Sequence, residues 1–488
     1  MNRWGAYCGE GRKARSVSLD SDEKCLFINS QIPKGGLFTG EKNVIHTDSN
    51  IPWRLSPEPF WLSSVELEWF EKLGDHLLEF YRVCNLLYSQ SVRGIQPEWV
   101  AAYLDQGKPE PVVNYGKMNR IKSQIPQVIR PDVLSTENGM IIAELDSVPG
   151  GMGFTGNLAM QYAKLDYEIV GGSNGMVLGF AEMIKSLTKH ERPTLAIVVS
   201  EESKDYWDEM KWFESALRKI PLDVYTVKPN DVLFTEHGLF LESCNSKVQI
   251  DVLYRFFELF DLRNIPKAEL MLYGAKKRTV VMTPPPKAYL EEKLLFALFH
   301  HPTLQPFWCR ELGKESYELL TNLIPQTWVL DPRELPPHAI IPNLEIDGMP
   351  VTNWRQITPV TQRQRRLVIK PSGFSELAWG SRGVVIGHDL STEDWEKAVE
   401  NSLASFHRTP YILQQFHKAK RVRMEYYDFN TGEVRSMAGR ALLRPYYFIT
   451  GEKVRLGGIQ ANICPADKKL LHGMVDSIIV PCALKPAA

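Results

Sequence analysis

Two β-rich runs on either side of Asn138-Gly139 place the strongest limit on what this chain can fold into. An Asn-Gly pair between such runs is a strong hairpin signal, so residues 127–147 are predicted to form two antiparallel strands. Side chains two positions apart along a strand point to the same face of the sheet. Each predicted strand carries two charged residues at this spacing, Arg130 and Asp132 on the first and Glu144 and Asp146 on the second.

The length of the hairpin loop decides whether these two charged pairs lie on one face. A two-residue loop of Asn138 and Gly139 turns Asp132 away from Glu144, because a shift of one residue moves a side chain to the opposite face. A three-residue loop that begins at Glu137, or an equivalent bulge, places Asp132 opposite Glu144. Glycine suits the left-handed position that ends such loops. We therefore predict the second register, with all four charged side chains on one face.

Three carboxylates on one strand face repel one another unless a cation lies among them. Carboxylate oxygens are ligands that Mg²⁺ prefers, and bound Mg²⁺ commonly also binds the phosphates of a substrate. We interpret Asp132, Glu144 and Asp146 as a candidate magnesium site. The alternative is a solvent-exposed strand face with scattered charges, and the spacing alone gives both interpretations similar weight.

The composition is that of an ordinary soluble globular protein. Of the 488 residues, 44% are hydrophobic and 24% are charged, which excludes a disordered chain. A chain of this length suggests about three domains. The 57 basic and 58 acidic residues give a net charge of −1. The chain therefore has no bulk electrostatic attraction to nucleic acid or to anionic membranes, and we expect neither as a partner.

The cysteines and the N-terminus indicate a cytoplasmic protein. The seven cysteines are scattered and form no Cys-x-x-Cys pair, which suits a reducing compartment better than a disulfide framework. Residues 1–17 contain no apolar core of the kind that a signal peptide needs. The longest clean apolar run, at 195–199, is far too short to cross a bilayer.

Hydrophobic periodicity divides the chain into four predicted parts: an irregular arm with a helical section at 1–115, the hairpin part at 116–190, an α/β layer at 191–270 and a mixed part at 271–488. Alternating strands and helices of the third part are typical of a parallel sheet, so the expected fold class is α+β with an α/β layer. The expected helices lie at 63–92, 97–104, 158–165, 175–188, 203–219, 288–300, 314–323 and 395–406. The expected strands lie at 194–199, 223–227, 248–254, 367–370, 384–386, 411–416 and, as several antiparallel strands, within 421–462.

A lysine and a glycine-rich loop in the fourth part could bind phosphate. Lys370 ends a short predicted strand, and residues 374–387 follow it as a loop that contains Gly380 and Gly383. Free backbone N–H groups in such a loop can surround a phosphate, and a lysine adds a compact positive charge. Taken alone, a lysine at a strand end is more often a surface residue. Five arginines alternate through the β-rich segment that follows, and the sequence does not sort them: Arg421, Arg423, Arg435, Arg440 and Arg444.

The segment Glu144-Leu-Asp146-Ser147-Val-Pro149-Gly150 resembles the ExN-(T/S)-x-PG metal motif of ATP-grasp ligases, and Arg130-Pro-Asp132 resembles their preceding Arg-x-Asp. In most ATP-grasp chains the nucleotide half comes first, whereas here its counterparts follow the hairpin. This inverted order resembles the circularly permuted ATP-grasp group, which includes the synthetase half of glutathionylspermidine synthase. The segment from Glu292-Lys293 to His301-Pro302 is similar to an NKA…HP segment of that group, and 411–416 is similar to its adenine hinge strand.

The resemblance implies an ATP- and Mg²⁺-dependent carboxylate–amine ligase that forms ADP through an acyl phosphate. Its partners would be a small-molecule or peptide carboxylate and an amine. The resemblance implies that Arg130 steadies the transferred group and that two Mg²⁺ bind Asp132, Glu144 and Asp146. It assigns a substrate loop to Ser147, Gly150 and Gly151, and ATP binding to Lys293, Lys370, Gly380, Gly383, Gln414, Gln415 and Phe416.

Two other interpretations stay open. A binding or scaffold protein derived from the ATP-grasp fold, without turnover, is suggested by three departures from the motif, at Asp146, Glu292 and Gln415. An NAD-dependent enzyme is suggested by the glycines of 171–179, which follow a short apolar run and open a predicted helix. Their spacing does not match GxGxxG, which makes this second alternative the weaker one.

Overall fold

The computed structural model describes residues 19–39, 53–243, 246–336, 338–468, 471 and 474–486. Most of the predicted N-terminal arm lies outside these residues. Its described part is helical and not irregular, with α1 at Ser21–Gln31 and α2 at Gly36–Thr39. The Asp20 carboxylate accepts the Glu23 backbone N–H at the start of α1, and the Glu23 side chain caps it in return.

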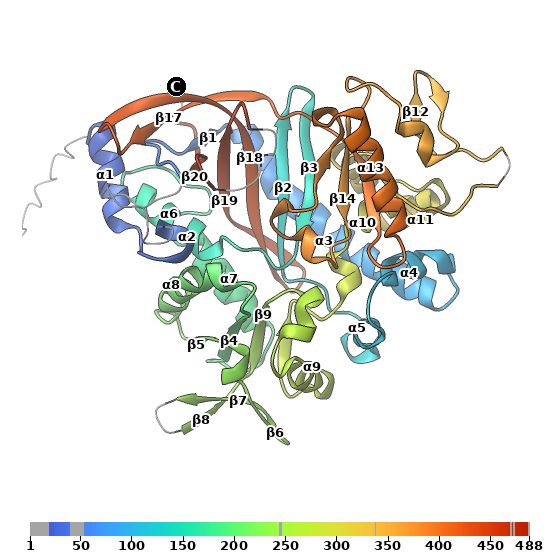
Figure 1. Cartoon of the computed structure of the whole chain (residues 1–488). Helices are drawn as coiled ribbons and strands as arrows, with labels where there is room; N and C mark the ends of the chain where they lie inside the picture. The colour runs from blue at the N-terminus through green and yellow to red at the C-terminus, as the bar shows by residue number, and fades with distance from the viewer. Residues whose placement is uncertain are drawn as a thin grey trace, which may run out of the picture.

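A seven-stranded sheet forms the centre of the molecule (Figure 1). The hairpin β2–β3 lies at one edge of this sheet, and β2 pairs with β18, which is about 300 residues later in the chain. The predicted hairpin and the predicted antiparallel strands within 421–462 are confirmed, and the structure joins them in one sheet. Its strands are β1 (Phe60–Leu62), β2 (Val128–Thr136), β3 (Gly139–Asp146), β17 (Arg421–Asp428), β18 (Glu433–Thr450), β19 (Lys453–Pro465) and β20 (Ile478–Leu484).

A parallel four-stranded sheet in the order β10-β9-β4-β5 lies below the central sheet in Figure 1. The predicted parallel layer is confirmed, although the predicted strand 248–254 is divided between two sheets. The elements are β4 (Thr194–Val199), α8 (Trp207–Leu217), β5 (Asp223–Val227), β9 (Val252–Phe256), α9 (Ala268–Lys277) and β10 (Val281–Thr283), with a small projecting sheet of β6 (Leu233–Thr235), β7 (Gly238–Ser243) and β8 (Ser246–Gln249).

A third sheet, in the order β11-β16-β14-β15, holds the segments that the sequence associates with nucleotide binding. Here β14 runs antiparallel to β16, and Lys370 pairs with Ile412. The elements are β11 (Thr327–Val329), β14 (Leu367–Pro371), β15 (Val385–Ile386), α13 (Thr392–Ala404) and β16 (Tyr411–Gln415), with a short ribbon of β12 (Glu345–Ile346) and β13 (Met349–Pro350).

The helices mostly follow the predicted pattern. Ser63 and Glu66 form a capping box at the start of the long helix α3, as expected from their spacing. Aromatic and aliphatic side chains of α3, α6, α10 and α11 pack with the central sheet in the largest apolar core. The bounds are α3 (Ser64–Val92), α4 (Glu98–Asp105), α5 (Glu110–Gly116), α6 (Met152–Ala163), α7 (Gly175–Ser186), α10 (Leu294–Phe299), α11 (Gln305–Leu312) and α12 (Lys314–Leu323).

Two predicted helices are wrong in detail. The helix expected at 288–300 is interrupted, with a short 3-10 turn at Ala288–Glu291 and α10 starting at Leu294. Glu292 is extended because its buried carboxylate is bonded by other segments, which overrides its helical propensity. The helix expected from Ser203 starts at Trp207, and the Ser203 side chain makes no capping hydrogen bond.

The glycine segment 171–179 does not form a dinucleotide-binding turn. A strand of the parallel sheet would have to precede it, but the described residues before it make only an isolated bridge from Ile169 to Ala483. Gly171 and Gly175 instead leave room for the backbone of Gly457, whose carbonyl oxygen would lie 2.1 and 2.3 Å from an added Cβ. The dehydrogenase alternative therefore loses its structural basis.

Among the helices that the structure describes, none combines the length and the apolar composition needed to cross a membrane.

Candidate functional site

The hairpin β2–β3 places the four predicted charged residues on one face. Asp132 pairs with Glu144 and Arg130 pairs with Asp146. The loop itself is shorter than predicted, because Thr136 pairs with Gly139. A register shift next to Asp132 leaves Ala143 as an extra residue on β3 and restores the expected pairing. The three-residue loop is thus wrong and the equivalent bulge is found.

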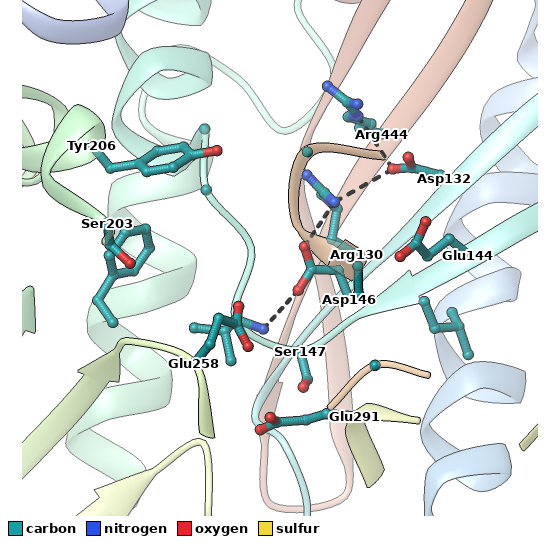
Figure 2. A pocket seen from close by; sticks show the side chains of 18 of the residues that line it. Arg130, Asp132, Glu144, Asp146, Ser147, Ser203, Tyr206, Glu258, Glu291 and Arg444 are labelled. Atoms are coloured by element: carbon teal, nitrogen blue, oxygen red, sulfur yellow. Dashed lines mark hydrogen bonds and ion pairs between the residues drawn. The ribbon is translucent and has the colours of Figure 1, made fainter. Parts of the chain in front are cut away.

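The face carries a network of ion pairs (Figure 2). One Arg130 Nη lies 2.8 Å from the Asp146 carboxylate and 3.5 Å from that of Asp132. The Nε of Arg444 on β18 lies 3.2 Å from Asp132, and Lys293 pairs with Glu144. Each of the three predicted metal-binding carboxylates therefore contacts a cationic side chain.

The surroundings set the charge of two of these acids in opposite directions. Burial opposes the ionisation of Glu144, but Lys293 and Lys370 outweigh it and hold the pKa of Glu144 below its ordinary value. Burial raises the pKa of Asp146, and Arg130 only partly offsets this. Across the cavity, burial and the neighbouring Glu291 raise the pKa of Glu258 to about 8. Crowding of acidic groups across the cavity therefore makes Glu258 keep its proton until the pH approaches 8 or a cation lies beside it.

The donor chemistry of this face fits Mg²⁺. Asp132, Glu144 and Asp146 offer only carboxylate oxygens, which hard divalent cations prefer. In the described part of the chain, no three His, Cys, Asp or Glu side chains converge closely enough to hold a metal ion as they stand. Binding would therefore require Mg²⁺ to replace Arg130 or Lys293 at some of these oxygens.

Two cavities meet at the hairpin and share Asp132 and Glu144 as lining residues. The first, of about 310 Å³, we call the loop cavity because Ser147, Gly150 and Gly151 line it, together with Lys293. The second, of about 300 Å³, we call the hinge cavity because residues 414–419 of the hinge line it. The acidic face thus separates two pockets, each large enough for part of a substrate.

The hinge cavity brings together most of the residues that the resemblance assigned to ATP. Lys370 Nζ donates to the carbonyl of Ala143 at 2.9 Å and to the Gln414 side-chain oxygen at 2.8 Å. Gln414, Gln415 and Phe416 line the same cavity, and Phe416 packs edge-on against His388 at 4.5 Å. Lys370 therefore connects the hinge strand to the hairpin. Lys370 and Lys293 both border the acidic face as expected, although Lys293 lines the loop cavity and not the hinge cavity.

Burial lowers the pKa of Lys370 to about 8, so the ATP-binding role that the resemblance assigns to Lys370 predicts an affinity for ATP that depends on pH. Only the cationic form attracts phosphate, and raising the pH from 7 to 9 is expected to weaken binding by roughly 10-fold. The free energy of unfolding should change in the opposite sense and rise between pH 8 and the ordinary pKa of 10.5. In this range Lys370 keeps its proton in the unfolded chain and loses it in the folded protein. Calorimetric titration with ATP measures the first effect. Lys370→Arg stays charged and should remove the dependence, whereas a pH-independent wild-type affinity would contradict it.

The loop after β3, which the resemblance assigns to substrate binding, is held from two sides. The Gly151 N–H donates to the buried carboxylate of Glu209 at 2.7 Å, and the Tyr446 hydroxyl donates to the Gly150 carbonyl at 2.8 Å. An added Cβ at Gly150 would lie 2.1 Å from the ring of Tyr206, so this position requires glycine. The loop is therefore held between the central sheet and the α/β layer.

The glycine-rich loop 372–383 forms part of the wall of the loop cavity. The first residues of the loop are anchored to Glu292. The Glu292 carboxylate accepts from the Ser372 hydroxyl at 2.6 Å and from the Gly373 N–H at 3.2 Å, and it also pairs with Lys108. Gly373 and Gly380 line the loop cavity, whereas Gly383 packs against Pro371 and Leu377 and is not among the described residues that line either cavity. The predicted role of Gly383 therefore lacks a direct contact.

An exposed ion pair joins this loop to the α/β layer. Arg382 lies 3.4 Å from Glu202 in the loop after β4. Exposed pairs contribute about 0.2–1 kcal/mol, so Arg382→Glu is expected to lower the free energy of unfolding by up to about 1 kcal/mol. Adding Glu202→Arg should restore the free energy of unfolding, since the pair is then reversed. Urea unfolding of both variants checks this, and a double variant no more stable than the single one would contradict the contact.

The structure sorts the five arginines and adds residues that the sequence did not indicate. Arg444 is 9% exposed and lines the loop cavity, and Arg440 lines the hinge cavity. Arg435 pairs with Asp428 at 3.0 Å, and the other two are exposed. The unexpected lining residues come mainly from the α/β layer and the segment after it: Ser203, Tyr206, Phe256, Glu258, Phe260 and Glu291.

Comparisons with known proteins bear on the fold. No family model and no curated protein matches the chain. A glutathione synthetase-like effector from Globodera pallida, solved without ligand, aligns with a TM-score of 0.57 and 11% identity over 95% of this chain and 97% of that chain. A protein described as a gamma-glutamylcysteine synthetase, from Methylobacillus flagellatus KT, aligns with a TM-score of 0.40 and 10% identity over 78% and 87%, too weak for an argument. The chain thus shares the mixed α/β fold of a synthetase-like protein.

Proposed function

We propose that this protein is an ATP- and Mg²⁺-dependent ligase that joins a carboxylate to an amine through an acyl phosphate and releases ADP. The observation that supports this best is the position of the acidic hairpin face between the hinge cavity and the loop cavity. A phosphoryl group passing from ATP to a carboxylate has to cross from one substrate to the other. Asp132 and Glu144 line both cavities at that point.

The residues around the face have separate proposed roles. The hinge residues and Lys370 hold the nucleotide, and Asp132, Glu144 and Asp146 hold up to two Mg²⁺, which would offset charge on the phosphates when bound. Arg130 and Arg444 stabilise negative charge on the transferred group and on the acid. Loop 372–383, anchored at Glu292, excludes water that would hydrolyse an acyl phosphate.

We also propose a circularly permuted ATP-grasp arrangement, related to glutathionylspermidine synthase in its synthetase part. The hairpin part at 116–190 and the nucleotide-binding part at 271–488 then form one functional unit, with the α/β layer inserted between them. The pairing of β2 with β18 supports this, since it joins the two parts in a single sheet. The partners are a small-molecule or peptide carboxylate and an amine.

Two of the three departures behind the non-catalytic alternative, Glu292 and Asp146, have structural explanations. Glu292 replaces a motif asparagine, but its carboxylate anchors loop 372–383 and pairs with Lys108. Asp146 replaces another, but it pairs with Arg130 and accepts the Val148 N–H at 2.9 Å. Both departures are therefore compatible with an active enzyme.

Measurement of ADP release tests the proposal. The protein is incubated with MgATP and a matrix of carboxylates and amines, and each mixture is also followed by thermal shift, because a ligand of the native state raises the melting temperature. We expect ADP release that needs Mg²⁺, a carboxylate and an amine together. Nucleotide binding without ADP release in any mixture would instead support the non-catalytic alternative.

A further inference from the structure

The loop cavity lies at the topological switch point of the parallel sheet. From β4 the chain passes to β5 on one side, and later returns to β9 on the other side of β4. Ligands of open parallel sheets bind in the crevice outside the carboxyl ends of two such strands. Ser203 and Tyr206 follow β4, and Glu258 and Phe260 follow β9, and all four line the loop cavity. The α/β layer therefore contributes a wall to the site.

The two ends of this cavity differ in charge. Figure 2 shows Arg444 and Asp132 at the top of the view and Glu258 and Glu291 at the bottom. Arg444 is nine-tenths buried, and its Nε is engaged by Asp132. Glu291 pairs with the buried Arg255. Among the residues that the structure describes, no cationic side chain lies within ion-pair distance of Glu258, which lines the cavity, and Arg255 and Lys293 act on it only from farther away. A ligand cation at this end would pair with the Glu258 carboxylate and displace its proton to solvent.

The walls beside Glu258 favour an organic cation over a metal ion. The rings of Tyr206 and Phe256 lie edge to face with centroids 5.5 Å apart, and Phe260 lines the same wall. Aromatic faces attract ammonium groups and pack against their apolar stems. Mg²⁺ instead needs several oxygen ligands and retains water, which aromatic walls do not supply.

We propose that the amine substrate binds in the loop cavity as an ammonium ion paired with Glu258, with its stem packed against Tyr206 and Phe256. The proposal rests on the proposed function, because it assigns the amine of that reaction to this end of the cavity. The carboxylate substrate then lies toward Arg130 and Arg444. The preferred amine carries an apolar stem and no carboxylate of its own, since a second carboxylate would face Glu258 and Glu291.

Three compounds with one aromatic stem test this preference in the full-length protein without ATP. Phenylethylamine carries an ammonium group, phenylethanol has none, and phenylalanine adds a carboxylate. The dissociation constant of phenylethylamine, measured by calorimetry, is expected to be at least about 10-fold lower than those of the other two compounds. Losing one charged contact of this kind corresponds to about 1.4 kcal/mol. Glu258→Gln should remove this preference, and Glu258→Lys should favour the carboxylate-bearing compound.

Glu242→Gln, which removes an exposed carboxylate of the same layer, is the matched control and should bind phenylethylamine as the wild type does. Equal binding of the amine and the alcohol, no binding of the amine, or an unchanged amine affinity in Glu258→Gln would each overturn the inference. A loss of Mg²⁺ affinity in Glu258→Gln with amine binding intact would also overturn it. Selective amine binding in a protein that never releases ADP would leave the inference standing and refute the proposed function.

Discussion

Glu144→Gln is expected to lower Mg²⁺-dependent ADP release by at least about 100-fold, the size of effect seen when a preorganised charge is removed from a transition state. Glu144 lines both cavities and pairs with Lys293, so it lies where the two substrates meet. Glutamine keeps the shape of the side chain and can still accept from Lys293, but it carries no charge for Mg²⁺. The loss should therefore fall on turnover more than on folding.

The cost in stability separates these two effects. Removing one partner of a buried ion pair is strongly destabilising, but the Glu144 side chain is 34% exposed to the cavity, so we expect a loss of only about 1 kcal/mol. Urea unfolding measures this loss. Glu137→Gln, at the exposed tip of the same hairpin, is the matched control and should change neither quantity. Wild-type turnover in Glu144→Gln would exclude a metal-binding role.

The charged face of the hairpin could be predicted because it depends on local spacing. Residues two apart share a face in any strand, and the Asn-Gly signal locates the turn. A bulge is one of the two predicted ways to reach this pairing, but its position at Ala143 could not be predicted, since it depends on contacts such as the hydrogen bond from Lys370 to the Ala143 carbonyl. The expected pairing was thus reached through a different loop.

The rest of the site depends on contacts between distant parts of the chain. Arg444 could not be separated from the other arginines, because its position opposite Asp132 follows from the pairing of Leu443 with Val133. Glu258 gave no signal either, since its role requires the strand order of the parallel sheet and the position of that sheet under the hairpin. Local patterns carry neither kind of information.

Glu292 illustrates how a tertiary contact changes a local prediction. The apolar pattern around it predicts a continuous helix, and the structure breaks the helix there. Its carboxylate satisfies Lys108, Ser372 and Gly373, and leaving these groups unpaired in the core would cost more than one helical turn stabilises. The break also places Lys293 beside Glu144. The departure from helical structure is therefore part of the site.

Gly373→Ala is the second substitution with a large expected effect, because Gly373 belongs to the part of loop 372–383 that is anchored to Glu292. An added Cβ would lie 1.9 Å from the backbone oxygen of Glu291, which cannot rotate away as a side chain could. The loop would have to move off Glu292, and the part of the cavity wall that it forms would be displaced. We expect a decrease of about 1–3 kcal/mol in the free energy of unfolding, as for other overpacked sites. We also expect a tenfold or larger loss of ligation, at roughly 1.4 kcal/mol per tenfold change.

Two measurements distinguish a misplaced loop from a protein that is merely less stable. If the loop excludes water, Gly373→Ala should release more ADP for each amide bond formed, because the acyl phosphate is then hydrolysed. Gly451→Ala, in the turn between β18 and β19, is the matched control: nothing lies within 4 Å of its added Cβ, and its φ of +64° costs only about 1 kcal/mol. Gly451→Ala should therefore keep ADP release and ligation coupled. Unchanged coupling in Gly373→Ala as well would contradict a water-excluding role for the loop, whatever the loss in stability.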